Sequence, residues 1–206
     1  MTTHSQDAFL QQAISQQAQD QLFGNARTQN GWLPVSVEDA QLRRLYELMK
    51  LAPTSANCSP ARLVFLRSAA AKERLRPTLN PGNVEKVMSA PVVAIIAYDT
   101  KFYELLPQLF PHNLSMQAMF ADKPALAEAT AFRNSSLQGA YLMLAARSIG
   151  LDCGPMSGFD AGKLNDEFFA DGRLRVNFLC NLGYGDSSKL FPRSPRLNFE
   201  QACELL

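Results

Sequence analysis

Histidine is scarce in this sequence, which has only His4 and His112 among its 206 residues. This scarcity disfavours metal sites built from several imidazole ligands, and it disfavours a catalytic triad that uses histidine as its base. His4 lies in the predicted frayed N-terminal tip and His112 in the segment LFPHN. We therefore expect no metal centre and no Ser-His-Asp hydrolase.

Cysteine is also sparse, and its positions form no recognisable pair. The four cysteines, Cys58, Cys153, Cys180 and Cys203, lie far apart, and none belongs to a C-x-x-C motif. This spacing disfavours a zinc site and a disulfide framework. We expect reduced thiols, as in a cytoplasmic protein.

Neither a strong charge nor a long apolar run is present. The formal net charge of +1 is too small to create a broad field that attracts nucleic acid or an anionic membrane. No segment has the roughly 20 apolar residues of a membrane span, and the N-terminus lacks the features of a signal peptide. Hydrophobic residues make up 47% of the chain, so we expect one soluble, cytoplasmic domain over residues 1–206.

Common nucleophile and nucleotide-binding motifs are missing as well. The segment GPMSGF has Pro155 where the G-x-S-x-G motif of hydrolases requires a glycine before Ser157. The segment GYGDSS starts like a nucleotide-binding loop but lacks its third glycine. Neither a Rossmann site nor a P-loop is visible.

Two helices are predicted in the N-terminal quarter. Apolar residues recur at roughly helical spacing near the N-terminus: Phe9, Ala13, Ile14, Ala18 and Leu22. Residues 1–20 are therefore predicted to form an amphipathic helix with a frayed tip. A second helix is predicted to start at Ser36, with Asp39 as its capping partner, and to end near Ala52 because Pro53 follows. Its predicted apolar positions are Leu42, Leu45, Tyr46 and Met49.

The middle of the chain combines two strands with one long helix. RLVFLRS (62–68) and PVVAIIAYD (91–99) are rich in β-branched residues and predict strands. The second is apolar throughout, which is typical of a central strand buried on both faces. Residues 123–149 predict a long helix that Gly150 ends, and beyond Leu137 it is apolar on nearly every side. Such a helix belongs in the middle of a structure or against a partner chain.

The C-terminal part is predicted to contain a short helix over 161–170, a last strand over 175–186 and a tail over 187–206. The tail contains prolines, arginines and a helix-like end, but it has no apolar core of its own. We expect it to be an arm that lies on something else.

Four polar segments remain as candidates for a site: NARTQNGW, APTSANCSP, DCGPMSGFD and PRSPRL. Taken alone, each has a purely structural interpretation. Arg27 could be a surface or interface arginine, the 53–60 loop an ordinary turn, and Arg193 with Arg196 a solvated face. Composition alone indicates an α/β-type protein and no specific chemistry.

In this order, the four segments resemble the FMN-dependent nitroreductase family, and the resemblance extends from Leu22 to Leu206. That family has an R-x-S-x-R-x-F-like motif, a helix ending in A-P-S-x-x-N-x-Q-P-W, a P-x-x-G-F segment after a long central helix, and a basic pair in its tail. The segments ARTQNGW, APTSANCSPA, GPMSGF and PRSPRL are similar to these motifs. NARTQNGW, AFRNSS, GPMSGFD and GYGDSSKL are also similar to the subgroup that contains the malonic semialdehyde reductase of pyrimidine catabolism.

The chain departs from the family motifs at five positions. Ala26 stands at the opening arginine, Asn30 where many members have lysine or arginine, and Ser157 where some have glutamate. Ser59 and Ala61 replace the usual glutamine and tryptophan. We expect these changes to alter the hydrogen bonds around a flavin more than its placement.

The resemblance implies an α+β protein with the three-layer α-β-α nitroreductase fold, in which helices flank a central, mostly antiparallel sheet. It also implies a homodimer that exchanges its C-terminal arms, residues 187–206, and binds FMN at the interface. Four loop residues would contact the FMN of the other subunit: Pro53, Thr54, Ser55 and Asn57.

Each further group of candidates matches one part of FMN. Guanidinium groups bind phosphate oxygens in pairs, and the phosphate candidates are Arg27, Thr28, Arg193 and Arg196. Donors near the N1 and C2 carbonyl edge favour reduction, and the candidates there are Asn30 and Asn83. One ring face would lie along Pro155, Met156, Ser157 and Gly158, with a backbone amide near Ser157 or Gly158 directed at N5.

The implied activity is a ping-pong oxidoreductase, in which NAD(P)H delivers a hydride to flavin N5 and leaves before a small acceptor enters. No side chain is assigned a catalytic role, which agrees with the scarcity of histidine. The subgroup resemblance implies malonic semialdehyde as acceptor and 3-hydroxypropionate as product. The candidates to bind the aldehyde are His112, Arg133 and Asn134.

Two alternatives stay open. Broad reduction of nitroaromatics or quinones needs only a flat, accessible pocket. A sensor or carrier that binds flavin without reductase turnover is compatible with the departures from the family motifs.

Overall fold

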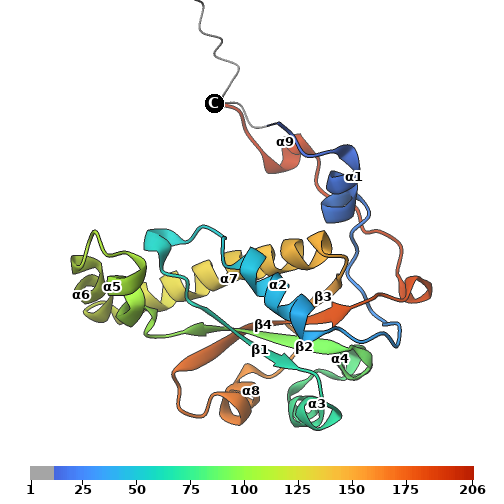
Figure 1. Ribbon diagram of the computed structural model, residues 1–206, viewed down its shortest axis with the longest axis horizontal. Coiled ribbons are helices and arrows are strands. Elements are labelled where there is room, and N and C mark those ends of the chain that lie inside the picture. The colour runs from blue at the N-terminus through green and yellow to red at the C-terminus, as the bar shows by residue number, and fades with distance from the viewer. Residues whose placement is uncertain (1–11) are drawn as a thin grey trace, which may run out of the picture.

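A four-stranded antiparallel sheet forms the centre of the computed structural model, which describes residues 12–206 (Figure 1). The strands lie in the order β1 (Ala61–Leu66), β2 (Val92–Asp99), β4 (Leu174–Gly183) and β3 (Asp152–Met156). All three strand pairings are antiparallel. Thr28 adds a single parallel bridge to Cys153 at the outer edge of β3. The mostly antiparallel sheet is therefore confirmed.

Strand β2 is apolar throughout because helices cover both of its faces. All of its residues are buried. Ala94 and Ile96 belong to one buried cluster, whereas Val93 and Ile95 belong to another, as the two-residue period of a strand requires. The predicted central strand is confirmed.

Helices form a layer on each side of the sheet (Figure 1). One face packs against α2 (Asp39–Met49) and α7 (Pro124–Ser148). The other face packs against α3 (Ala69–Leu75), α4 (Pro81–Ser89) and α8 (Ala161–Phe168). This arrangement confirms the three-layer α-β-α fold and the predicted helices near 161–170 and 123–149.

A third apolar cluster closes one end of the sheet. It includes Tyr98 and Cys58 together with residues of three short helices: η5 (Phe102–Leu105), α5 (Leu106–Leu109) and α6 (Ser115–Ala121). Phe102 and Phe120 meet edge to face there, with ring centroids 5.0 Å apart. The cluster forms the floor under the loop that precedes β1, because Cys58 belongs to that loop.

The remaining elements are single turns. They are α1 (Gln16–Gln19), η2 (Asp20–Gly24), η3 (Ser55–Asn57), η4 (Arg76–Thr78), η6 (Ser187–Lys189) and α9 (Phe199–Ala202). The predicted N-terminal helix begins later than expected, at Gln16, because Ser15 caps it by accepting a hydrogen bond from the Ala18 N–H, and it continues through η2 to Gly24. Ala13 and Ile14 therefore lie outside the helix, and the part of the prediction before residue 12 falls outside the described residues.

The predicted start of α2 is wrong. Its N-cap is Glu38, whose backbone N–H donates to Gln41 Oε1 at 3.0 Å. Ser36 instead donates its hydroxyl to Glu38, so the expected capping pair with Asp39 does not form. The helix ends at Met49, a few residues before the expected end. Of its predicted apolar positions, Leu42, Leu45 and Met49 are buried and Tyr46 is exposed.

Strand β3 was not predicted, because its sequence DCGPM contains two residues that weaken strands. Pro155 has no N–H for a sheet hydrogen bond, and proline is tolerated on edge strands for that reason. Gly154 brings the chain close to its neighbour, because a Cβ there would lie 2.8 Å from the carbonyl oxygen of Gln29. The edge of β3 is thus open to the segment that contains Thr28.

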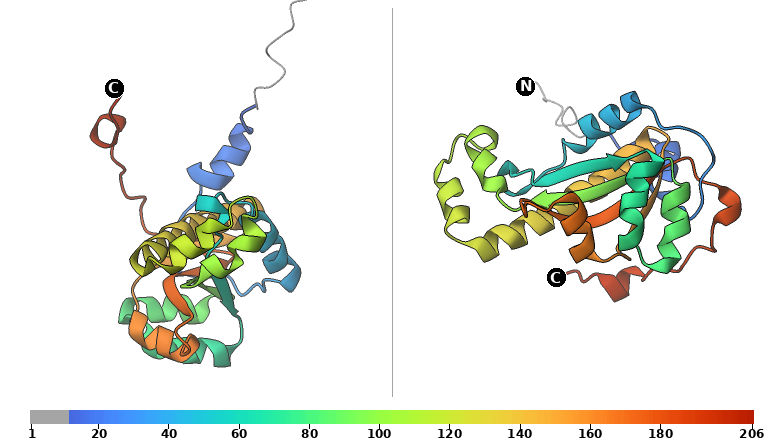
Figure 2. Two further views of the ribbon diagram at one scale, coloured as in Figure 1. Left: turned by 90° about the vertical axis from the view of Figure 1, so that its left-hand side faces the viewer. Right: turned by 90° about the horizontal axis from the view of Figure 1, so that it is seen from below.

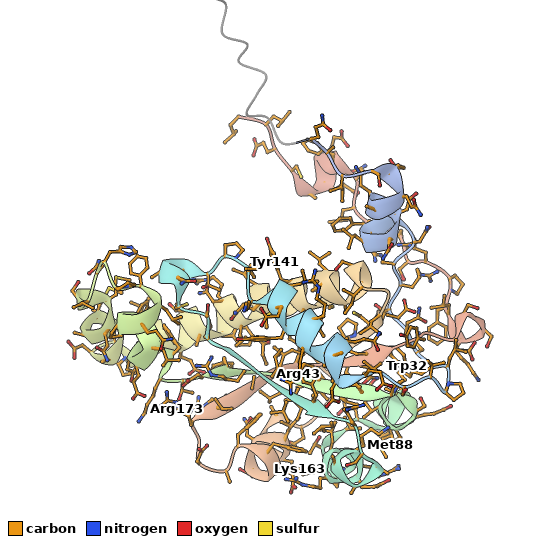
Figure 3. The ribbon with its side chains drawn as sticks, viewed as in Figure 1. Trp32, Arg43, Met88, Tyr141, Lys163 and Arg173 are labelled. Atoms are coloured by element: carbon orange, nitrogen blue, oxygen red, sulfur yellow. The ribbon has the colours of Figure 1, made fainter. Side chains whose placement is uncertain are left out.

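Helix α7 crosses the sheet with one side packed and the other exposed. A Cβ at Gly139 would lie 2.4 Å from Phe178 Cζ, so glycine permits the close approach of α7 to β4. On the other side, Leu137 and Tyr141 are 47% and 39% exposed, and Figure 3 shows Tyr141 on the side away from the sheet. Gly150, with φ 82°, follows the helix end as predicted.

The C-terminal tail leaves the body as an extended segment. Phe191, Leu197 and Phe199 are exposed, and Figure 2 shows that α9 and α1 follow different paths away from the sheet. Exchange of this arm with a second copy stays a prediction. Among residues 12–206, no helix combines the length and apolar character that crossing a bilayer requires.

Replacing Gly139 with alanine tests the contact that sets the position of α7. We expect Gly139→Ala to lower the free energy of unfolding by about 1–3 kcal/mol, because the new methyl group overlaps Phe178. The control is Gly82→Ala in α4, where a Cβ meets nothing within 4 Å and stability should stay equal or rise by up to about 1 kcal/mol. Urea unfolding measures both, and equal stability of the two variants would contradict the packing.

Candidate functional site

Several cations line one cavity of about 430 Å³ beside β3. They are Arg27, Lys86, Arg147, Arg193 and Arg196. Thr28 and Asn30 line the same cavity, so all four phosphate candidates and one ring-edge candidate lie together. None of the ion pairs in residues 12–206 includes any of these cations. The cavity therefore concentrates positive charge that no carboxylate of the described residues neutralises, and it can hold an anion such as phosphate.

Two arginines tie the C-terminal tail to the N-terminal wall of this cavity. Arg27 donates to the Phe191 carbonyl oxygen. In the reverse direction, Arg193 Nη2 donates to the carbonyl oxygens of Gly24 at 2.7 Å and Ala26 at 3.2 Å. A guanidinium group has five N–H donors, so each arginine keeps donors for a ligand. The tail and the segment before Thr28 are thereby held as two walls of one site.

Lys86 reaches the cavity because its helix is fastened to the sheet. The Lys86 carbonyl oxygen accepts hydrogen bonds from Trp32 Nε1 at 3.2 Å and from the buried Asn181 Nδ2 at 3.0 Å. Figure 3 shows Trp32 at the end of the sheet where α4 lies. Lys72 Nζ satisfies two more carbonyl groups at this helix end, those of Met88 and Ala90. The orientation of α4 is therefore fixed by contacts outside the helix.

Asn83, one turn before Lys86, holds the loop that follows β3. Its Nδ2 donates to the Gly158 carbonyl oxygen at 2.9 Å, and the Asn80 backbone N–H donates to the same oxygen at 3.1 Å. A Cβ at Gly158 would lie 2.5 Å from Asn83 Nδ2, so a larger residue would displace the Asn83 amide. The predicted role of Asn83 at the flavin ring edge stays a prediction, and within this chain its amide supports Gly158.

The ring-face candidates lie farther along β3 and in the loop that follows it. Pro155 and Met156 end β3, and Ser157 and Gly158 follow in the loop. Next to them, the Gln29 N–H donates to the Cys153 carbonyl oxygen at 3.0 Å, one residue beyond the bridge formed by Thr28. The 27–30 segment, α4 and the end of β3 thus form one continuous surface.

The 53–59 loop lies far from the cation-lined cavity in space. The Ser55 N–H donates to Asn134 Oδ1, and the Ala61 N–H donates to Gln138 Oε1, both at 2.8 Å. Arg147 comes 13 residues after Asn134 in α7, which is about 20 Å along a helix axis. Figure 1 shows the teal loop near α5 and the blue 25–30 segment at the opposite end of α7. Within one chain, the loop and the cation-lined cavity do not meet.

The three substrate candidates are also separated. His112 is exposed in the turn after α5, with its ring 3.8 Å from the Phe110 ring between centroids. Arg133 is exposed on the outer side of α7 and lines a cavity of about 590 Å³ with Phe132. Asn134 is buried, and its Nδ2 donates to the Thr130 carbonyl oxygen at 2.8 Å. Its Oδ1 accepts the hydrogen bond from the Ser55 N–H, so its amide supports the loop.

Neither thiol nor metal chemistry is indicated at these sites. Burial raises the pKa of the Cys58 thiol to about 11, so the group stays protonated and is no nucleophile at neutral pH. Within the described range 12–206, no three His, Cys, Asp or Glu side chains are arranged to hold a metal ion.

Lys86 and Arg147 are the site residues that the sequence analysis missed. Both are single basic residues in helices, and neither belongs to a recognisable motif. A signal for Lys86 was available, because residues three apart in a helix share a face and Asn83 was already a candidate. Arg147 gave no such signal, since only the fold brings the end of α7 to the tail.

Comparisons with known proteins agree with this geometry. The nitroreductase family profile matches residues 8–184. The chain is 61% identical over 188 residues to a protein of Cupriavidus pinatubonensis provisionally named NADH dehydrogenase/NAD(P)H nitroreductase, a match that covers 90% of this chain and 96% of that protein. It is 60% identical over 186 residues to HadB of Ralstonia pickettii, which has the same provisional name, and covers 89% and 95% of the two chains.

A solved structure shows the same fold. It is that of a provisionally named nitroreductase from Exiguobacterium sibiricum in complex with FMN, with a TM-score of 0.82 and 21% sequence identity. The match covers 95% of this chain and 99% of that chain.

Inorganic phosphate should stabilise the protein through the cation-lined cavity. At a phosphate concentration about tenfold above its dissociation constant, binding adds about 1.4 kcal/mol, which raises the melting temperature by about 3–5 °C. Differential scanning fluorimetry against chloride at equal ionic strength measures the shift. Lys86→Gln and Arg147→Gln should reduce it, whereas Arg43→Gln, at an exposed α2 position outside the cavity, should not. A shift that is equal in all three variants would contradict an anion site here.

Proposed function

Because the chain belongs to the nitroreductase family, we propose that it is an FMN-dependent oxidoreductase that transfers a hydride from NAD(P)H to a small electron acceptor. The observation that carries this proposal is the cavity lined by Arg27, Lys86, Arg147, Arg193 and Arg196, in which no ion pair of the described residues neutralises a cation. The proposal includes a cytoplasmic location, where NAD(P)H is available.

The residues at this cavity fit a flavin mononucleotide. Its phosphate is a dianion, and guanidinium and ammonium groups are the side chains that bind phosphate most strongly. The adjoining loop can approach a planar ring closely, because Gly158 has no side chain and is held from behind by Asn80 and Asn83. A net charge of only +1 supports a local anion site over a general affinity for polyanions.

Each chain would hold the cofactor with three sets of side chains. Arg27, Arg193 and Arg196 would bind the phosphate with Thr28, and Lys86 and Arg147 would add charge to the same cavity. Asn30 would donate to the ring edge, and the 155–158 segment would lie beside the ring. When bound, FMN would supply the redox chemistry, since it accepts a hydride from NAD(P)H and passes it to the acceptor. The protein would contribute binding, orientation and donors, in ping-pong order.

We propose that the working unit is a homodimer with exchanged C-terminal arms. Pro53, Thr54, Ser55 and Asn57 would then contact the FMN bound by the partner copy. The distance of about 20 Å along α7 between this loop and the cavity supports the arrangement, because a single chain does not bring them together. The exposed apolar side of α7, with Leu137 and Tyr141, and the exposed tail offer surface for a second copy.

The acceptor we propose is malonic semialdehyde, which would be reduced to 3-hydroxypropionate. The similarity of NARTQNGW and GPMSGFD to the corresponding enzyme subgroup supports this acceptor. Its carboxylate requires a cation, and exposed Arg133 lines the cavity on the outer side of α7. His112 is a second exposed polar group. Reduction of nitroaromatics or quinones is the alternative, and the names of the relatives at about 60% identity favour it.

Absorbance spectroscopy tests the cofactor. The purified protein should be yellow, with maxima near ~370 and ~450 nm, and NADH or NADPH should bleach the band at ~450 nm under anaerobic conditions. Addition of an acceptor should restore the band. A protein that stays colourless with excess FMN would contradict the proposal, and a yellow protein that NAD(P)H fails to bleach would be a flavin-binding protein without turnover.

Steady-state kinetics test the acceptor. Malonic semialdehyde should give parallel double-reciprocal lines against NAD(P)H, as ping-pong order requires. Arg133→Ala should raise the KM for the aldehyde acid by about tenfold or more, because a carboxylate loses its charged partner, but it should leave the KM for a neutral nitroaromatic unchanged. Arg43→Ala is the control. Rapid turnover of nitroaromatics without any turnover of the aldehyde would establish the alternative.

A further inference from the structure

The loop between α2 and β1 has an unusual backbone. Three of its residues adopt left-handed φ angles although none is glycine: Ala56 at 50°, Asn57 at 48° and Ser59 at 37°. Such conformations cost free energy for residues that have a Cβ, and they persist only where the surrounding structure enforces them. The contacts that hold these three residues in place therefore indicate which part of the loop has a function.

Some of these contacts close the loop upon itself. The Asn57 N–H donates to the Thr54 carbonyl oxygen and the Cys58 N–H to that of Ser55, both at 3.0 Å. The Ser59 N–H donates to Thr54 Oγ1 at 3.1 Å. Cys58 is buried in the apolar cluster under the loop. These contacts give the loop a shape, but they do not orient it relative to α7.

Two buried amides of α7 provide that orientation. Asn134 is 0% exposed and Gln138 is 3% exposed, and residues four apart in a helix share a face. Asn134 Oδ1 accepts a hydrogen bond from the Ser55 backbone N–H, and Gln138 Oε1 accepts one from the Ala61 backbone N–H, each at 2.8 Å. Ser55 precedes the three left-handed residues and Ala61 follows them, so α7 holds the strained segment at both ends.

The direction of the Asn134 amide is itself fixed. Its Nδ2 donates to the Thr130 carbonyl oxygen one turn earlier in α7, at 2.8 Å, which leaves Oδ1 pointing at the Ser55 N–H. In the loop, Ser55 and Asn57 are exposed while Cys58 and Pro60 are buried. The Asn57 Nδ2 donates to the Leu109 carbonyl oxygen at 2.8 Å, which leaves its Oδ1 open among the described residues. The Ser55 hydroxyl has no hydrogen-bond partner in the part of the chain that the structure describes.

We propose that Asn134 and Gln138 are positioning residues for the flavin, because they present Ser55 and Asn57 of the loop to FMN bound by the partner copy. The inference rests on the proposed function and deepens it. Helix α7 also carries Arg147 at its other end. Helix α7 would therefore set the distance between the 53–59 loop, which would contact the FMN of the partner copy, and Arg147, which would contact the FMN bound by the same chain.

Paired substitutions separate positioning from general stability. Asn134→Leu removes the acceptor for the Ser55 N–H at nearly constant volume, and it should weaken FMN binding roughly tenfold or more. Asn134→Asp restores an oxygen. In its protonated form the acid can donate to Thr130 and accept from Ser55, and burial raises the pKa of a carboxyl group. FMN affinity of this variant should therefore approach that of the wild type at low pH and fall as pH rises, whereas the leucine variant should show no such pH dependence.

Gln138 gives a second, independent comparison. Gln138→Glu keeps an acceptor for the Ala61 N–H, whereas Gln138→Met does not, so only the methionine variant should lose FMN affinity. The pair also keeps the inference testable if Asn134→Leu fails to fold. Fluorescence titration of FMN measures affinity, and hydrogen–deuterium exchange at the Ser55 and Ala61 amides measures whether the loop has been released.

Ser135→Ala is the matched control, because Ser135 is buried next to Asn134 but bonds only Phe132 and Asn177. Its FMN affinity should stay within about twofold of wild type. If the wild type binds FMN and both Asn134→Leu and Gln138→Met bind it as tightly as the control, the inference is wrong while the proposed function stands. If the wild type itself does not bind FMN, the proposed function fails.

Discussion

The close packing of helix α7 against the sheet determines where the polar groups of this protein lie. Gly139 lets the helix approach Phe178 of β4, and this contact fixes the rotation and height of the helix above the sheet. Asn134 and Gln138 then face the loop before β1, and Arg147 faces the tail. A helix is stiff on this length scale, so the two polar regions keep their separation.

Electrostatics distinguish the cation-lined cavity from the rest of the molecule. Several arginines elsewhere form ion pairs, as where buried Asp99 accepts hydrogen bonds from both Arg62 and Arg173. In the cavity, Arg27 and Arg193 instead donate to backbone carbonyl groups, which orient the guanidinium groups without cancelling their charge. An anion is the natural partner of such a cavity. The proposed cofactor would supply it with its phosphate.

The sequence predicted those features whose residues are close together in the chain. The unbroken apolar run of β2 and the long periodicity of α7 were sufficient to identify the central strand and helix. Strand β3 was missed because Pro155 and Gly154 weaken a strand signal, although an edge strand tolerates both. The start of α2 was misplaced because Glu38 with Gln41 competes with Ser36 as a cap.

The candidate site was predictable only through resemblance to a family. That resemblance placed Arg27, Thr28, Asn30, Arg193 and Arg196 in one site, and the cavity contains all five. Lys86, Arg147 and the supporting role of Asn134 depend on contacts between distant segments, which no local pattern encodes. Sedimentation velocity of the FMN-loaded protein, detected near ~450 nm, tests the central claim most directly. The account predicts that the flavin absorbance sediments with two chains and one FMN per chain, and flavin that sediments with a single chain, or with none, would contradict it.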